Sequence, residues 1–261
     1  MWETIKFEVR ENGVALLTMN RPKQMNSFND QILLEMKKAV KIVRDSEKIK
    51  VLVITGSGNA WSAGGDINAL SGGPQTAIEA KQQYDFSTNM IGEIYELPIP
   101  VIAAVNGVVA GAATSMMMAC DLIVASDKAR FGFNFINIGL CPDGGNTYFL
   151  VRKVGYNKAA EILWFGDLVS AEDALRFNLV NQLVPHEEVL TQALALADRL
   201  VTRPMFTVKL DKKILRQAMT NDWYQQSELE NMNQVQAWAS EDFKEGARAF
   251  LEKRKPNFKG R

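Results

Sequence analysis

The stretch VIAAVNGVVAGAATSMMMACDLIVAS, residues 101–126, carries the pattern that predicts the fold of this chain. Residues 101–105 are continuously apolar, the turn pair Asn106-Gly107 ends that run, and small residues and methionines follow up to Cys120. A second apolar run starts at Leu122. Short apolar runs bounded by turn residues are typical of buried strands. We therefore expect a buried strand, a turn, a buried helix and a second buried strand.

Residues 97–120 contain no charged side chain, so a membrane-spanning helix has to be considered. Such a helix needs about 20 residues without helix-breaking interruptions. Pro98, Pro100 and Asn106-Gly107 interrupt this region. The N-terminal residues MWETIKFEVRENG have neither the basic nor the apolar part of a signal peptide. We expect a cytoplasmic protein that has no membrane partner.

Charge and residue counts exclude several classes of function. The 261 residues include 30 Lys and Arg and 30 Asp and Glu, so the formal net charge is zero. Without surplus positive charge, sequence-independent binding of nucleic acid loses its main driving force. His186 is the only histidine, which excludes metal motifs with two histidines, and we expect no metal site. Cys120 and Cys141 lack CxxC spacing and are too few for a disulfide framework, so we expect reduced thiols.

Strand and helix patterns alternate through the first 150 residues. Residues 14–19, 50–55 and 129–133 are strand-like, and helices are expected after Ser27, with Asp30 as a capping acid, and over about 76–96. Beyond Asn157 the helical period dominates. The alternation predicts an α/β fold with a helical C-terminal portion. No linker rich in glycine and serine separates the two parts, so we expect one compact body.

The triplet Gly56-Ser57-Gly58 follows a predicted strand, as the first glycines of a dinucleotide-binding loop do. The third glycine of that motif would fall on Trp61, whose side chain is too large for a helix to pack closely on the strand. No Gly-Lys-Ser/Thr follows, which excludes a Walker loop. We therefore expect no nucleotide cofactor.

Two clusters of small residues are candidates for binding a carbonyl oxygen. Ala63-Gly64-Gly65 lies in the loop WSAGGDI after a strand, and Gly111-Ala112-Ala113 begins a predicted helix. Glycine lets the backbone approach a ligand closely, and a helix N-terminus has unpaired N–H donors. Two such donors converging on one oxygen would form an oxyanion hole. The alternative is that both are tight turns kept small by packing.

A family resemblance extends from the first strand to the last residues of the chain. It is carried by ITGSGNAWSAGGDI, VNGVVAGAATSMMMACDLIVAS, KARFGF, INIGLCPDGG and EGARAFLEKRKPNFKG. These segments resemble the enoyl-CoA hydratase/isomerase (crotonase) superfamily. The resemblance implies a crotonase-like spiral of ββα repeats over residues 1–195 and a helical trimerisation region over residues 196–261. It also implies a homotrimer or a dimer of trimers, an acyl-CoA substrate, and no cofactor apart from the coenzyme A that the substrate carries.

The resemblance also assigns site residues. The N–H groups of Ala63 and Ala112 would stabilise the enolate of the thioester. Asp66 would serve structure and contact with coenzyme A, and Phe250 and Lys253 would contact the nucleotide portion, in some members from a neighbouring subunit. The full set expected to bind substrate is Ala63, Gly64, Gly65, Asp66, Ile67, Gly111, Ala112, Ser115, Phe135, Phe250 and Lys253.

The residues at the acid/base positions decide which reaction is expected. Hydratases of the superfamily add water with two glutamates, and at those positions this chain has Ser115 and Phe135. A phenylalanine cannot exchange a proton, and a serine without a histidine partner is a poor base at neutral pH. A hydratase of the two-glutamate type is therefore not expected.

One carboxylate, Asp143 in LCPDGG, occupies the place where isomerases of the superfamily have an acid. A single carboxylate can remove a proton at one carbon and return it at another. We expect Phe133, Phe135 and Leu140 to exclude water from it and so to raise its pKa. The alternative is that Asp143 only forms a turn beside Gly144-Gly145.

Three functions follow from these residues. The first is an enoyl-CoA isomerase that uses Asp143 as a proton shuttle, either for a double-bond shift in an acyl chain or for rearrangement of a ring-derived CoA ester. The second is an enoyl-CoA hydratase, a lyase, in which Ser115 or Asp143 activates water in an atypical way. The third is a non-catalytic acyl-CoA-binding protein.

Overall fold

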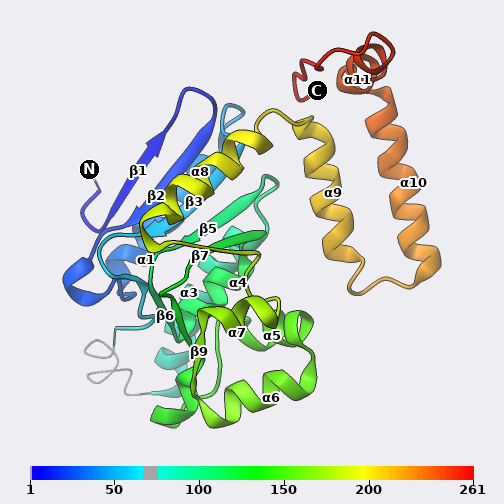
Figure 1. Cartoon of the computed structure of the whole chain (residues 1–261). Helices are drawn as coiled ribbons and strands as arrows, with labels where there is room; N and C mark the ends of the chain where they lie inside the picture. The colour runs from blue at the N-terminus through cyan, green and yellow to red at the C-terminus, as the bar shows by residue number, and fades with distance from the viewer. Residues whose placement is uncertain (1, 67–75) are drawn as a thin grey trace.

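The computed structural model describes residues 2–66 and 76–261 and contains two β-sheets (Figure 1). The larger sheet has the order β1-β2-β3-β5-β7-β10, in which β1 pairs antiparallel with β2 and the other neighbours are parallel. Its strands are Ile5–Val9 (β1), Val14–Met19 (β2), Val51–Gly56 (β3), Val101–Val105 (β5), Leu122–Ser126 (β7) and Gln182–Val184 (β10).

The smaller sheet has the order β4-β6-β8-β9, and its first three strands are parallel. They are Ala60–Ser62 (β4), Val108–Ala110 (β6) and Arg130–Gly132 (β8), followed by Leu168–Ser170 (β9). Each of β3, β5 and β7 in the larger sheet is therefore followed by a strand of the smaller sheet. The helices Ala77–Tyr95 (α3) and Ala112–Ala119 (α4) then lead to the next pair. This repetition is the predicted ββα spiral, and the prediction is confirmed.

The continuous apolar character of β3 and β5 follows from burial of the larger sheet on both faces. In β3, Val51 and Val53 belong to one apolar cluster, and Leu52 and Ile54 belong to the other. Alternate residues of a strand point to opposite faces, so both sets must be apolar when both faces are covered. The helix Val189–Leu200 (α8) covers the first face, and Asp30–Asp45 (α1), α3 and α4 cover the second.

The predicted boundary between residues 195 and 196 falls inside α8. Ala193 and Ala197 of this helix are buried in the same cluster as Val51 and Val53. The chain leaves the sheet only after Leu200. The helices Met205–Gln217 (α9), Trp223–Ala239 (α10) and Glu241–Leu251 (α11) then stand away from the two sheets (Figure 1). The helical C-terminal region is confirmed, but one chain does not form the single compact body that we expected.

Two helix starts show how capping sets the local structure. Asn29, not Ser27, caps α1, because its side chain accepts a hydrogen bond from the N–H of Ile32 at 3.1 Å. Ser27 is buried and bonds to Asp66 instead. At α3, Thr76 and Glu79 form a reciprocal capping box, which explains why that helix begins where the sequence predicts.

The remaining elements are short helices outside the two sheets. The α-helices are Asn146–Val154 (α5), Tyr156–Phe165 (α6) and Ala171–Arg176 (α7), and the 3-10 helices are Pro22–Gln24, Asn134–Ile138 and His186–Glu188. No pattern in the sequence indicated β9 and β10, because a three-residue strand is too short to show alternation. Within the described part of the chain, no helix is long and apolar enough to cross a membrane.

Candidate active site

A cavity of about 460 Å³ brings together most of the residues that the sequence predicted for the site. It lies where α1, α3, α4 and the loop before α5 meet. The predicted residues in its lining are Ala63, Gly65, Asp66, Gly111, Ala112, Phe135, Leu140 and Asp143, and the sequence did not point to Phe28, Tyr84, Ser87, Asn134 and Cys141, which also line it. These additional residues come from helices and loops whose positions depend on the tertiary fold, so local patterns could not reveal them.

The loop after β4 runs beside residues 25–28, and its backbone groups are largely occupied. The Ala63 N–H donates to the Met25 carbonyl at 2.9 Å, and the Asp66 N–H donates to the Phe28 carbonyl at 3.0 Å. The prediction that Ala63 supplies an oxyanion donor is therefore wrong, because its N–H is already engaged. Small residues indicate that a backbone can be approached, but they do not indicate which N–H faces the ligand.

Gly65 is the residue of this loop whose N–H is open. It forms a parallel bridge with Phe28, in which Phe28 bonds to the residues on either side of Gly65. A bridged residue in this position points its own N–H away from the partner strand. Among the described residues, none accepts a hydrogen bond from the Gly65 N–H. We assign the first donor to Gly65 in place of Ala63.

The second predicted donor, Ala112, is the first residue of α4, where an N–H has no acceptor within the helix. Gly64 allows the two donors to lie close together. Its φ is +81°, and a β-carbon on it would lie 3.1 Å from the Ala112 nitrogen and 2.4 Å from the Ala110 carbonyl oxygen. Two open N–H groups thus border one cavity, which is the arrangement that an oxyanion hole requires.

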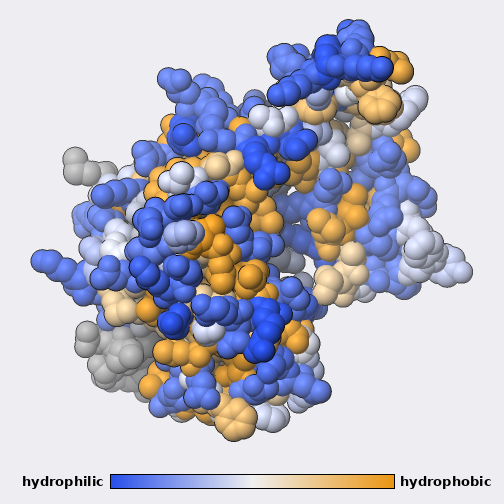
Figure 2. All heavy atoms as spheres, in the orientation of Figure 1, coloured by the Kyte–Doolittle hydropathy of each residue, from blue (hydrophilic) through white to orange (hydrophobic). Residues whose placement is uncertain are grey.

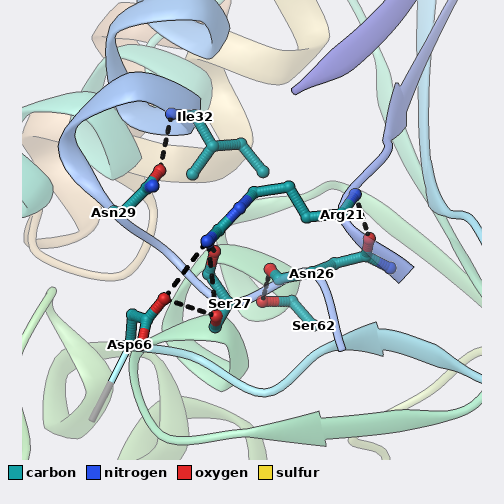
Figure 3. A network of polar contacts seen from close by, with 7 residues as sticks. All are labelled: Arg21, Asn26, Ser27, Asn29, Ile32, Ser62 and Asp66. Atoms are coloured by element: carbon teal, nitrogen blue, oxygen red, sulfur yellow. Dashed lines mark hydrogen bonds and ion pairs between the residues drawn. The ribbon is translucent and has the colours of Figure 1, made fainter. Parts of the chain in front are cut away.

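A partly buried polar network holds the Gly65 loop against the start of α1 (Figure 3). The Asp66 carboxylate accepts hydrogen bonds from Arg21 and from the Ser27 hydroxyl, each at 3.2 Å. Arg21 also donates to the Ser27 carbonyl at 2.5 Å, and the Ser62 hydroxyl donates to the Asn26 carbonyl at 2.8 Å. The structural role expected for Asp66 agrees with this network. Ile67, the next predicted residue, lies outside the described residues.

Asp143 carries an unsatisfied carboxylate oxygen at the cavity. Its Oδ1 is buried, and no donor in the described part of the chain reaches it. Burial raises the pKa of this carboxyl group above its ordinary value. A carboxylate with one unpaired oxygen and a raised pKa is suited to accepting and returning a proton.

Ser115 does not contact the cavity as predicted. Its side chain is fully buried, and its hydroxyl donates to the Asp143 carbonyl at 2.9 Å. The predicted substrate contact at Ser115 is therefore wrong, because the residue lies behind the Asp143 loop. Phe135 does line the cavity, whereas Phe133 is fully buried in the core.

One chain does not bring Phe250 and Lys253 to the cavity. Phe250 is 84% exposed on α11, and Lys253 follows that helix, at the opposite end of the molecule from α3 and β6 (Figure 1). Contact of these residues with coenzyme A stays a prediction that needs a neighbouring subunit. Within residues 2–66 and 76–261, no group of three or more His, Cys, Asp or Glu side chains could hold a metal ion.

Comparison with known proteins identifies the family to which the chain belongs. Residues 9–261 match the family model described as enoyl-CoA hydratase/isomerase. The chain is 36% identical over 256 residues to the 1,2-epoxyphenylacetyl-CoA isomerase of Escherichia coli K12, covering 96% of this chain and 97% of the relative. It is also 36% identical over 258 residues to the crotonyl-CoA hydratase of Syntrophomonas wolfei, covering 98% of each. An enoyl-CoA hydratase structure from Bacillus anthracis superposes with a TM-score of 0.95 at 26% identity, covering 99% of this chain and all of that one.

Proposed function

Because the chain belongs to the enoyl-CoA hydratase/isomerase family, we propose that it is an enoyl-CoA isomerase with Asp143 as its proton shuttle. The observation that carries the proposal is the unpartnered, buried Oδ1 of Asp143 in a cavity bordered by the open N–H groups of Gly65 and Ala112. Ser115 and Phe135 occupy the positions at which hydratases need glutamates. Asp143 is therefore the one acid that we assign to the reaction, whereas hydratases of the two-glutamate type use two acids.

The proton transfer can be written for a 3-enoyl thioester. The thioester oxygen accepts hydrogen bonds from Gly65 and Ala112, and the Asp143 carboxylate removes a proton from C2. The electron pair moves onto the thioester oxygen and gives a dienolate, which the two N–H groups stabilise by about 3–4 kcal/mol each. The protonated Asp143 then returns the proton to C4, and the double bond moves to C2–C3. No atom is gained or lost, so no cofactor is required.

Exclusion of water supports isomerisation over hydration. Phe135 is 7% exposed and lines the cavity together with Phe28 and Leu140. An apolar lining keeps water from C3 of the conjugated 2-enoyl thioester, where addition of water would give a 3-hydroxyacyl product. The name of the Escherichia coli relative keeps a ring-derived CoA ester as a candidate substrate beside a plain enoyl chain.

The apolar surface of the C-terminal helices supports a homotrimer or a dimer of trimers. Figure 2 shows apolar side chains on the surface of α9. Leu215 on α9 and Val235 and Trp238 on α10 are each at least 65% exposed. Association of identical copies would bury them, and we propose that Phe250 and Lys253 then contact the substrate bound by a neighbouring copy. We retain a cytoplasmic location, without nucleic acid or membrane as partners, as part of the proposal.

Trans-2 and trans-3 enoyl-CoA substrates test the function. An isomerase interconverts them, and chromatography detects the shifted double bond without uptake of water. The similarity to a crotonyl-CoA hydratase favours hydration as the second candidate. A 3-hydroxyacyl-CoA product as the main product would establish that candidate and refute ours. Binding of both esters without conversion would indicate an acyl-CoA-binding protein.

A further inference from the structure

A buried polar bridge joins the starts of α4 and α5. The Asn146 side-chain NH2 donates to the Thr114 hydroxyl at 2.7 Å and to the Ser115 hydroxyl at 3.0 Å. The Thr114 hydroxyl donates to the Gly111 carbonyl at 2.7 Å, and the Ser115 hydroxyl donates to the Asp143 carbonyl at 2.9 Å. The three bridging side chains are at most 1% exposed, so water does not compete for these bonds.

We propose that Asn146, Thr114 and Ser115 are positioning residues that hold the proton shuttle in register with the oxyanion hole. One arm of the bridge ends on Gly111, directly before the Ala112 donor, and the other ends on Asp143. The inference rests on the proposed function. In this proposal Ser115, which is a poor base, does not transfer a proton but affects the reaction by positioning Asp143.

The count of donors and acceptors fixes the direction of the bridge. Each hydroxyl has one hydrogen, which goes to a backbone carbonyl, so each must accept from Asn146. The two amide hydrogens of Asn146 are then both used. The reversed amide would accept both hydroxyl hydrogens and would place its own two hydrogens where no acceptor lies within the described residues, so two buried donors would be unpaired. In the observed orientation one acceptor, the Asn146 Oδ1, has no partner within the described residues, which costs less than two unpaired donors.

The geometry of the Asp143 loop explains why a bridge is needed. Gly144 and Gly145 follow with φ of +60° and +79°, and glycine restrains a turn less than any other residue. The Asp143 Oδ1 has no hydrogen bond, and the carboxylate bonds to the backbone of Asp143 itself, so the position of the carboxylate depends on that backbone. That backbone is held by the Ser115 hydroxyl and by the Asn146 N–H, which donates to the Asp143 carbonyl at 3.0 Å.

Single substitutions can break each arm. Ser115→Ala removes the arm to Asp143, and Thr114→Val removes the arm to Gly111 while keeping the side-chain shape. Thr114→Ser keeps the hydroxyl and should retain activity. Thr55→Val is the matched control, because the Thr55 hydroxyl is also buried and donates to a carbonyl, that of Ala104 at 2.9 Å, away from the cavity.

We expect Ser115→Ala and Thr114→Val to lower kcat of the isomerisation by about 10- to 100-fold, since misplacement of a reacting group by about 1 Å has effects of this size. KM should stay within about twofold. The acid limb of the kcat–pH profile should move to lower pH in Ser115→Ala, because a looser loop hydrates Asp143 and returns its pKa toward the ordinary value. In an Asp143→Asn background, Ser115→Ala should cause no further loss.

Wild-type kcat and an unmoved acid limb in Ser115→Ala would overturn the proposal, as would an equal loss in Thr55→Val. Absence of isomerisation by the wild type would refute the function instead. In that case, hydrogen exchange of residues 139–146 still tests the bridge. Exchange should be faster in Ser115→Ala than in Thr55→Val, and equal exchange in the two variants would refute the bridge.

Discussion

The cavity loops and the C-terminal helices differ in how many of their polar and apolar groups find a partner within one chain. Around the cavity, backbone groups on both sides of Gly65 are bonded, which leaves the Gly65 N–H and the Asp143 Oδ1 open. On α10, by contrast, Trp223 and Trp238 are 76% and 65% exposed. Lys212 on α9 anchors this region to the core by bonds to the Ile99 carbonyl and to Asp121. The difference teaches that one chain alone brings the proposed reaction site together, whereas it leaves apolar side chains of the C-terminal helices exposed.

The largest effect should come from Asp143→Asn. The amide keeps the shape but cannot accept a proton, and loss of a general base costs about 10²–10⁴-fold in kcat. Binding of the CoA ester should change little, because the Gly65 and Ala112 donors remain. Steady-state kinetics and a binding titration measure both. Retention of more than about a third of kcat would remove Asp143 from the mechanism.

Gly64→Ala should have the next largest effect on the cavity. Its β-carbon would meet the Ala110 carbonyl oxygen at 2.4 Å at a φ of +81°, so the two donor segments must move apart. We expect kcat/KM to fall by about 10²-fold or more, the cost of losing one oxyanion donor. Gly92→Ala on α3 is the control, since among the described residues no atom beyond its chain neighbours and the backbone of its own helix lies within 4 Å of a β-carbon there. Equal activity of the two variants would contradict the donor assignment.

Ser115→Glu tests whether the missing glutamate can simply be restored. The sequence alone suggests that Ser115→Glu with Phe135→Glu creates hydratase activity. The structure predicts the opposite for Ser115, because the site is fully buried and its hydroxyl supports Asp143. We expect a loss of about 3–5 kcal/mol in stability from the unpaired buried charge, and loss of isomerisation. Denaturant unfolding measures the first, and a stable, hydrating variant would refute this expectation.

Glu35 offers a pH test within the well-packed part of the chain. Although burial alone would raise the pKa of Glu35, hydrogen bonds from Glu3, Thr4 and Gln31 lower that pKa to about 2. A lowered native pKa stabilises the fold above the unfolded value of about 4.5, and this contribution is lost as pH falls toward 2. Glu35→Gln should remove on the order of 3 kcal/mol of that pH dependence. Identical unfolding curves of both proteins between pH 5 and about 2 would contradict it.

The smallest effect on the stability of a single chain should come from Val235→Ser with Trp238→Ser. Both side chains are exposed, so each change should alter unfolding of the core by about 0.5 kcal/mol or less. Association should be lost all the same, because this surface is the proposed contact between copies. Light scattering at micromolar concentration measures the mass. A wild type that is already monomeric would show that the C-terminal helices need no further apolar surface.

The sequence predicted the fold more fully than the site. Buried strands such as residues 101–105 are apparent because both faces of the sheet are covered, which leaves an uninterrupted apolar run. Asp143 could be singled out by its place in LCPDGG. Asn146 could not, since a buried asparagine that bridges two helices looks like any turn asparagine in the sequence.

The chain by itself determined the ββα alternation, the helical C-terminal region and the absence of both hydratase glutamates, because residue type and period are local properties. Only the tertiary structure decided that the N–H of Gly65 is open at the cavity while that of Ala63 is bonded, and that the Ser115 hydroxyl donates to the Asp143 carbonyl instead of lining the cavity. The physical reason is the same in both cases. Whether an N–H or a hydroxyl is free depends on the partner it meets, and here the partners lie 38 and 28 positions away, at Met25 for Ala63 and at Asp143 for Ser115.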